Sequence, residues 1–240
     1  MLHGAQRDLF ELDFRTPAEC ADRLAAGAAD IGIVPSIELR RQDLEIIRGV
    51  GIACRGPVRS ILLVSKTDPA RIRTLATDSS SRTSVMLARI LLARRYGAEP
   101  LCIAHPPDLS RMLATADAAL IIGDPALYLD PGSLPYRVLD LGEEWTVMTG
   151  LPMVFAVWAG HGPFAPDLAP AFVESCRFGL AHLDDIVAAE AGTRNLSQCF
   201  IRDYLTRHLT LELGPGEYRG LETFLRYSAE FVDSEKERTV

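Results

Sequence analysis

The chain has 240 residues, of which 48% are hydrophobic and 24% are charged, and its formal net charge is −7. This composition is ordinary for a globular protein, and the length suits one substantial domain or two small ones. The acidic balance, with no cluster of Lys and Arg among aromatic residues, argues against a nucleic-acid-binding protein. No run of about 18 apolar residues occurs, so the sequence predicts no membrane span.

The five cysteines and five histidines are scattered along the chain. The cysteines form no C-x-x-C pair and are odd in number, which favours free thiols in a reducing compartment. No histidine lies three or four residues from another, so no pair of metal ligands is expected on one helical face. The first ten residues lack the pattern of a signal peptide. We therefore expect a cytoplasmic protein that binds no metal.

The first quarter of the chain predicts a strand, a helix and a second strand. Residues 10–14 alternate apolar and acidic side chains, as a half-exposed strand does. The box Thr16-Pro17-Ala18-Glu19 predicts the start of a helix that ends at Gly27. The apolar run 31–34 predicts a parallel strand buried on both faces. Ligands of open α/β sheets collect at the carboxyl ends of strands, so Ser36 either contacts a ligand in a crevice or caps a turn.

The most informative stretch is residues 74–92, which predicts a short strand, a polar turn and a helix. Hydroxyl side chains and one guanidinium gather where the helix begins, namely Ser79, Ser80, Ser81, Arg82, Thr83 and Ser84. The first N–H groups of a helix have no internal partner and carry partial positive charge, and Arg can bind a carboxylate through two hydrogen bonds. One Ser could simply cap the helix. Five hydroxyls with Arg82 exceed a single cap, and they predict a site for a small anion.

Further strands are expected at 44–50, 60–65, 100–104, 118–122 and 153–158, and a short helix at 108–113. The strand at 118–122 breaks at Gly123-Asp124-Pro125, so Gly123 and Asp124 are also candidates for the site. From residue 165 onward only helices are expected, at 167–191, 195–208 and 218–231. Strands that alternate with helices predict a doubly wound, parallel α/β architecture.

The strands at 60–65 and 153–158 enclose a segment with its own strand–helix pattern. We therefore expect two lobes, one formed by residues 1–65 with 153–240 and the other by residues 66–152. A cleft between them would collect Ser36 from one side and residues 79–84 with Gly123 and Asp124 from the other. Such a cleft would close by a hinge around a small polar molecule.

Five motifs, in this order, resemble the chorismate dehydratases of the futalosine route to menaquinone: IGIVPSIEL, SILLVSK, LATDSSSRTSVMLARILL, ALIIGDPAL and DLGEEW…TGLPMVFAVW. The resemblance implies a fold like that of the type II periplasmic binding proteins, with a helical C-terminus. It also implies a hydro-lyase that converts chorismate, a dicarboxylate, to 3-[(1-carboxyvinyl)oxy]benzoate and water with no metal or organic cofactor.

Within this family assignment, residues 79–84 are expected to hold one carboxylate of chorismate. Arg82 would either join them or bridge to Asp78 or Asp124. Asp124 is the catalytic candidate, because it could orient the departing hydroxyl, or it could cap the turn at Pro125. Glu143 and Glu144 are candidate bases by residue type only, and a solvated acidic turn is the better interpretation of them. The residue that takes the proton is not identified.

One departure from the family pattern concerns the start of the chain. Members of the family usually open with a strand that ends in Tyr-Leu-Asn and whose Asn reaches the cleft. This sequence begins at about the point where that segment would have ended. We therefore expect that the first strand of the first lobe is missing, either through a start codon assigned too late or through loss of part of the site.

Two other functions fit the predicted architecture. The 1,4-dihydroxy-6-naphthoate synthases of the same pathway resemble this fold, but they carry a His where this chain has Gly123. A solute-binding protein for a small carboxylate would be expected to carry an export signal. Turnover of chorismate, as opposed to binding alone, separates the enzyme from the binding protein.

Overall fold

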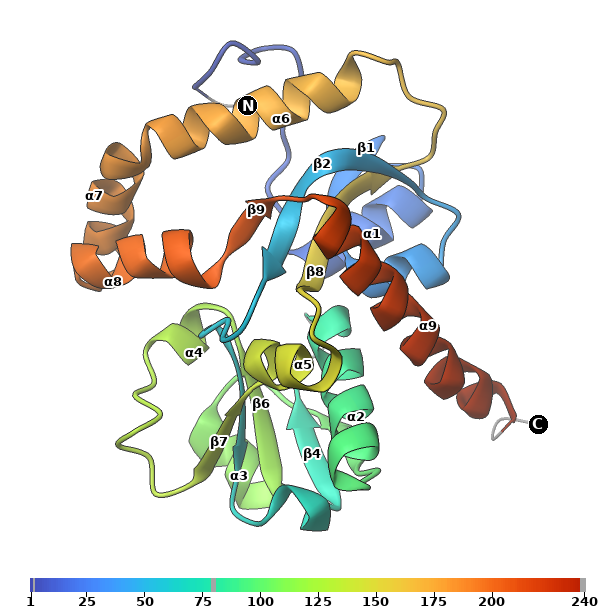
Figure 1. Cartoon of the computed structure of the whole chain (residues 1–240), viewed down its shortest axis with the longest axis vertical. Helices are drawn as coiled ribbons and strands as arrows, with labels where there is room; N and C mark the ends of the chain where they lie inside the picture. The colour runs from blue at the N-terminus through green and yellow to red at the C-terminus, as the bar shows by residue number, and fades with distance from the viewer. Residues whose placement is uncertain (2, 79–80, 238–240) are drawn as a thin grey trace.

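The computed structural model describes residues 1, 3–78 and 81–237 of the chain. It consists of two lobes, each built on one β-sheet, with β2 and β8 running toward the junction between them (Figure 1). The two sheets and their helices confirm the predicted two-lobed α/β architecture.

The first lobe contains a four-stranded sheet in the order β1-β8-β2-β9. Its strands are β1 (Ile31–Pro35), β8 (Met153–Gly160), β2 (Glu45–Cys54) and β9 (Thr210–Glu212). Its helices are α1 (Pro17–Ala25), η1 (Ser36–Arg40), α6 (Leu168–Ala181), α7 (Leu183–Arg194), α8 (Gln198–Asp203), the π-helical turn η3 (Tyr204–His208) and α9 (Pro215–Glu237).

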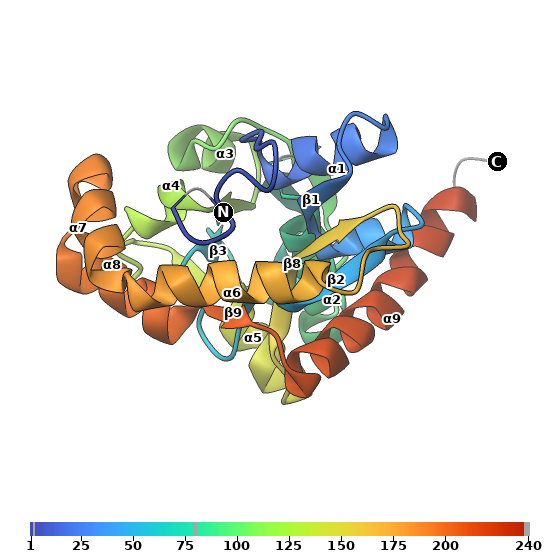
Figure 2. The same ribbon diagram turned by 90° about the horizontal axis from the view of Figure 1, so that it is seen from above.

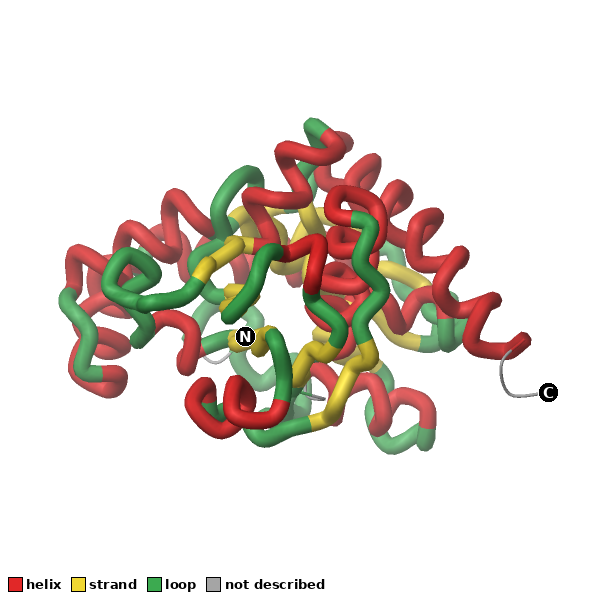
Figure 3. The backbone as a smooth tube through the Cα atoms, turned by 90° about the horizontal axis from the view of Figure 1, so that it is seen from below, coloured by secondary structure: helices red, strands yellow, loops and turns green. Residues whose placement is uncertain are grey.

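The second lobe contains a five-stranded sheet in the order β5-β4-β6-β3-β7. Its strands are β5 (Leu101–Ala104), β4 (Thr74–Thr77), β6 (Ala118–Ile122), β3 (Ile61–Ser65) and β7 (Arg137–Asp140). Its helices are η2 (Pro69–Arg71), α2 (Arg82–Tyr96), α3 (Leu109–Thr115), α4 (Asp124–Leu127) and α5 (Leu141–Thr149). Helices surround the strands on both sides (Figure 3).

Several local predictions need correction. Residues 11–16 have no regular structure, although a strand was expected at 10–14. The run at 31–34 is not a central parallel strand, because β1 pairs antiparallel with β8 at the edge of the four-stranded sheet. Only the β4–β5 and β4–β6 pairings are parallel among the described strands. The helix expected at 167–191 is two helices that meet at His182.

The expected division of the chain after residue 65 also differs from the sheet pairing. β3 pairs with β6 and β7, so it belongs to the sheet of the second lobe. Its five residues are all buried, because helices cover both faces of this central strand. The second lobe therefore begins near Ile61.

The free side of β1 borders a hollow of about 530 Å³ in the first lobe. Its walls include the apolar side chains Leu9, Phe10, Trp158 and Phe172. β1 pairs with β8 alone among the strands of the described ranges. An unpaired edge exposes backbone N–H and C=O groups that another strand can bind. The expectation that a strand is missing here stays a prediction.

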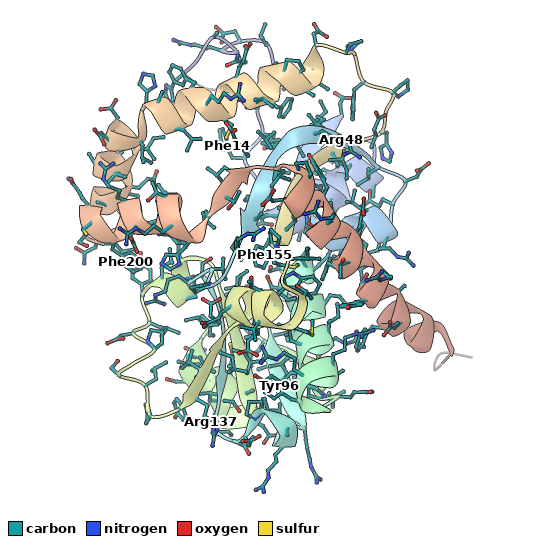
Figure 4. All side chains as sticks on the ribbon, viewed as in Figure 1. Phe14, Arg48, Tyr96, Arg137, Phe155 and Phe200 are labelled. Atoms are coloured by element: carbon teal, nitrogen blue, oxygen red, sulfur yellow. The ribbon has the colours of Figure 1, made fainter. Side chains whose placement is uncertain are left out.

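The largest apolar cluster joins the two lobes. It contains Leu87, Leu91 and Trp145 of the second lobe together with Phe155 and Phe224 of the first. Phe155 lies at the junction between the lobes in Figure 4. Because interiors of this kind are closely packed, the lobes share a core on the side of α2 and α9.

Candidate functional site

The candidate site starts at the carboxyl ends of two adjacent strands of the second lobe. β4 and β6 are parallel neighbours, with Thr77 opposite Leu120. The turn that leads into α2 follows β4, and Gly123 and Asp124 follow β6. The sheet therefore brings these two predicted groups of residues to the same edge, where α/β folds bind ligands. Ser79 and Ser80 lie outside the described residues.

The first turn of α2 is not capped by its own N-cap residue. Ser81 occupies the N-cap position, but its side chain makes no capping hydrogen bond. Its Oγ donates instead to Ser84 Oγ, 2.8 Å away. The Ser81 side chain thus places no capping oxygen on the partial positive charge at the helix start. This arrangement can bind a carboxylate.

The two hydroxyls that follow are buried. Thr83 is 2% exposed and Ser84 is 1% exposed. Thr83 Oγ1 accepts a hydrogen bond of 3.3 Å from the backbone N–H of Ile37, which belongs to η1 of the first lobe. Thr83 therefore connects the lobes at the start of α2.

Arg82 also connects the lobes. Its Nη2 donates to both carboxylate oxygens of Asp22 in α1, at 2.7 and 2.9 Å, and its Nη1 donates to Glu38 Oε1 in η1, at 3.1 Å. Partial burial by itself would lower the pKa of Arg82, but the bonds to Asp22 and Glu38 outweigh it, and the pKa is raised. The expected bridge to Asp124 is wrong, since Arg82 pairs with carboxylates of the first lobe.

Ser36 does not offer its hydroxyl to a cleft. The residue is fully buried, and its Oγ donates to the carbonyl oxygen of Val154 in β8 at 2.8 Å. The sequence left open whether Ser36 contacts a ligand or caps a turn, and its hydroxyl instead bonds to the neighbouring strand. Its hydroxyl ties the start of η1 to the adjacent strand.

Gly123 and Asp124 form the start of α4. Gly123 has a φ of 69°, in a region that disfavours side chains, and its N–H donates to the carbonyl of Ser60 at 2.8 Å. Asp124 Oδ2 lies 3.1 Å from Arg194 Nε at the end of α7. Asp124 thus pairs with the helical arm of the first lobe, formed by α7, α8 and η3, which lies on the opposite side of the molecule from α9 (Figures 1 and 2).

The sequence did not indicate the polar pair at the base of this arm. Tyr204 O–H donates to Ser60 Oγ at 3.0 Å. Burial raises the pKa of Tyr204. Tyr204 opens the π-helical turn η3, a type of turn that often occurs at functional sites. No local pattern in the sequence predicts this turn.

Arg59 supports the same region from the segment that crosses between the lobes. Its backbone adopts a φ of 68°, unusual for a residue with a side chain. Its guanidinium donates to the carbonyls of Ala126 and Leu129 and lies 5.6 Å from the ring centre of Phe200 in α8. Phe200 faces the second lobe in Figure 4. Arg59 thereby holds α4 against the arm.

Glu144 lies away from the first turn of α2. Glu144 Oε2 accepts from Tyr96 O–H at 2.6 Å and pairs with Arg95 at 2.8 Å. Tyr96 is the last residue of the 15-residue helix α2, so Glu144 is roughly 20 Å from the first turn of α2 at 1.5 Å per residue. Glu143 is exposed in the first turn of α5. Glu144 is therefore outside the candidate site, whereas the N–H of Glu143 bonds to Asp140, which also accepts from the N–H of Arg59.

Within the described ranges, no group of three or more His, Cys, Asp or Glu side chains could hold a metal ion. The same ranges contain no helix whose length and apolar character would let it cross a membrane. The five cysteines are free thiols.

Comparisons with known proteins identify the family. Residues 1–230 match the family model described as menaquinone biosynthesis. The chain belongs to this family. One curated relative, named chorismate dehydratase, from Thermus thermophilus, is 31% identical in an alignment 222 residues long that covers 85% of this chain and 81% of the relative.

Solved structures show the same fold at low sequence identity. A protein of Archaeoglobus fulgidus superposes with a TM-score of 0.67 and 15% identity, over 94% of this chain and 86% of that one. The periplasmic aliphatic sulphonate binding protein of Escherichia coli gives a TM-score of 0.60 and 18% identity, over 92% and 80%. These similarities confirm the binding-protein-like fold.

Proposed function

We propose that the protein is a chorismate dehydratase of the futalosine route to menaquinone. The observation that carries the proposal is the 31% identity to a chorismate dehydratase across most of both chains, together with membership of the menaquinone biosynthesis family. The reaction would be that of a hydro-lyase, in which chorismate loses water to give 3-[(1-carboxyvinyl)oxy]benzoate.

The geometry at the start of α2 supports this substrate. Chorismate carries two carboxylates, and the first turn of α2 would offer N–H groups to one of them. The Ser81 hydroxyl, which donates to Ser84 Oγ in the structure, would turn to donate to that carboxylate. Loss of the ring hydroxyl and of a neighbouring hydrogen makes the ring aromatic, so the reaction is downhill. The protein then mainly holds the ring in place, provides a base and assists the departing hydroxyl.

For Asp124 we favour a structural role. Its carboxylate already pairs with Arg194, and it begins α4. To orient a departing hydroxyl it would have to exchange that partner for the substrate. Its pairing therefore supports the role of a link between the second lobe and the helical arm.

We also propose that the protein works in the cytoplasm on a small-molecule substrate. The free thiols of the chain fit a reducing compartment. Chorismate-like dicarboxylates are the class of substrate that we propose.

The test is incubation of the purified protein with chorismate, followed by chromatography of the products. We expect the aromatic enolpyruvyl product to form in buffer containing a chelator. Chorismate that stays unchanged under all conditions contradicts the proposal. Tight binding of chorismate in calorimetry without turnover would favour a solute-binding protein instead.

A further inference from the structure

Glu38 is a buried carboxylate whose partners come from both lobes. The residue is 1% exposed and lies in η1 of the first lobe. Its Oε1 accepts from Arg82 Nη1 at 3.1 Å and from Arg41 Nη1 at 3.4 Å, and its Oε2 accepts from Gln42 Nε2 at 3.2 Å. A buried charge is tolerated only when such partners neutralise it.

Arg82 is the better placed of the two cationic partners. Its side chain is 27% exposed, whereas that of Arg41 is 54% exposed, so the Arg82 pair is the less screened by water. Arg82 also holds Asp22 of α1 through two hydrogen bonds. The guanidinium is thus already occupied by two carboxylates of the first lobe.

The position of Arg82 in its helix gives this pairing a consequence for the site. Arg82 is the first residue of α2, directly after the uncapped Ser81. The bond from Ile37 N–H to Thr83 Oγ1 joins the same two elements one residue further on. Together these contacts fix the first turn of α2 against η1.

We propose that Glu38 is a positioning residue for the reaction. Through Arg82 it holds the carboxylate-binding turn of α2 against the first lobe, in the geometry that closes the site around the substrate. Arg82 serves as a bridge between the lobes and not as a ligand of the substrate. This inference rests on the proposed function for its kinetic part and on the geometry alone for its structural part.

The test compares Glu38→Gln with the matched control Glu230→Gln. Glu230 pairs with Arg94 near the other end of the same helix, where the pair is exposed and joins α2 to α9. Small-angle X-ray scattering of the protein without substrate should show a larger radius of gyration for Glu38→Gln and an unchanged one for Glu230→Gln. This measurement is independent of the identity of the substrate.

Kinetics with chorismate provide the second measurement. Misplacement of a binding group by about 1 Å can lower the rate about 100-fold, so we expect Glu38→Gln to lower kcat/KM by about 10- to 100-fold, with a fall in kcat as well as a rise in KM. Glu230→Gln should stay near the wild-type value. Arg82→Lys keeps a positive charge beside Glu38 but loses the pair of hydrogen bonds to Asp22. Its kcat/KM should therefore lie between those of the wild-type protein and Glu38→Gln.

Each outcome decides the proposal. If Glu38→Gln matches Glu230→Gln in both scattering and kinetics, Glu38 has no positioning role and the proposal is overturned. If Glu38→Gln does not fold, Arg82→Lys decides by the same two measurements, and wild-type behaviour there overturns the proposal. If the wild-type protein does not turn over chorismate, the proposed function fails, while the scattering result still decides whether Glu38 holds the lobes together.

Discussion

At the scale of single residues, the hydroxyls at the start of α2 have different roles despite their similar chemistry. Thr83 and Ser84 are buried, and Thr83 bonds to the first lobe. Ser81 is half-buried and makes no capping bond. Among the described hydroxyls of this turn, Ser81 is therefore the one that we propose as a contact of a substrate carboxylate.

Replacement of Ser81 by Ala should weaken chorismate binding by about 1–3 kcal/mol, the usual effect of losing a hydrogen bond to a charged group. The free energy of unfolding without ligand should fall by about 0.5–1.5 kcal/mol, the usual net value of one hydrogen bond, because Ser81 Oγ donates to Ser84 Oγ. Calorimetric titration and thermal melting measure the two effects. Ser133→Ala, in an exposed turn of the same lobe, is the control. Unchanged affinity with a large loss of stability would contradict an anion site at this turn.

The Tyr204–Ser60 pair makes a second prediction at this scale. Tyr204→Phe removes the donor to Ser60 Oγ, a buried group, and should lower the free energy of unfolding by about 1–3 kcal/mol. Tyr128→Phe is the control, because the Tyr128 hydroxyl donates at 2.9 Å to the carbonyl of Arg194 but its side chain is exposed. Urea denaturation measures both. If the free energy of unfolding falls equally in the two variants, the buried hydrogen bond of Tyr204 stabilises the fold no more than the exposed one of Tyr128.

At the scale of elements, the contact between α2 and α5 depends on a titratable pair. Tyr96, at the end of α2, donates to Glu144 of α5. Burial raises the pKa of Tyr96 to about 12, with help from the bond to Glu144. The neutral phenol is thus the form that the folded protein favours.

This contact predicts a loss of stability at alkaline pH. The folded pKa of Tyr96, about 12, lies above the unfolded value of about 10. The stability that the neutral phenol contributes is therefore fully present below about pH 10 and is lost as the pH rises toward about 12. The free energy of unfolding of the wild-type protein should therefore fall more steeply over this range than that of Tyr96→Phe. Denaturant titrations at several pH values measure the slopes. If the free energy of unfolding falls with pH equally in both proteins, folding does not raise the pKa of Tyr96.

At the scale of the whole molecule, α9 ties the lobes into one unit. Phe224 of α9 is fully buried and packs edge-on against Trp145 of α5, with ring centroids 6.2 Å apart. Arg94 of α2 also lies 3.9 Å from the ring centre of Tyr227 in α9. Figure 1 shows α9 running along the side of both lobes. The shared core predicts that the lobes unfold together.

The two tryptophans allow that prediction to be tested, because Trp145 lies in the second lobe and Trp158 in β8 of the first. In Trp145→Phe and Trp158→Phe, the remaining indole reports on one lobe. Its fluorescence transition should coincide with the far-ultraviolet circular dichroism transition of the same variant. Separate midpoints would show that the lobes unfold independently.

Phe224→Ala tests the role of α9 in this coupling. Truncation of a buried Phe typically costs about 3–5 kcal/mol, so the midpoint in urea should fall markedly. Phe224→Leu, which keeps most of the apolar volume, is the control and should lose less. A small effect of Phe224→Ala would mean that α9 adds little to the junction.

The sequence by itself determined the elements and the family of this protein. The apolar runs that became β3, β6 and β8, the capping box of α1 and the polar turn before α2 are local patterns, which depend on neighbours within a few residues. These patterns, and the order of the five motifs, led to the two-lobed fold and to the menaquinone family. They also placed Gly123 and Asp124 beside the α2 turn, since parallel strands end at one edge.

Only the tertiary structure decided which side chains pair across the lobes. Arg82 meets Glu38 and Asp22, which lie 44 and 60 residues away in the chain, and Asp124 meets Arg194, 70 residues away. No local periodicity encodes such pairs, because any of the 25 Lys and Arg residues and 32 Asp and Glu residues is an equally good partner until the backbone brings two together. The antiparallel edge position of β1 and the burial of Ser36 arise in the same way, from contacts with β8 that begin more than 100 residues later.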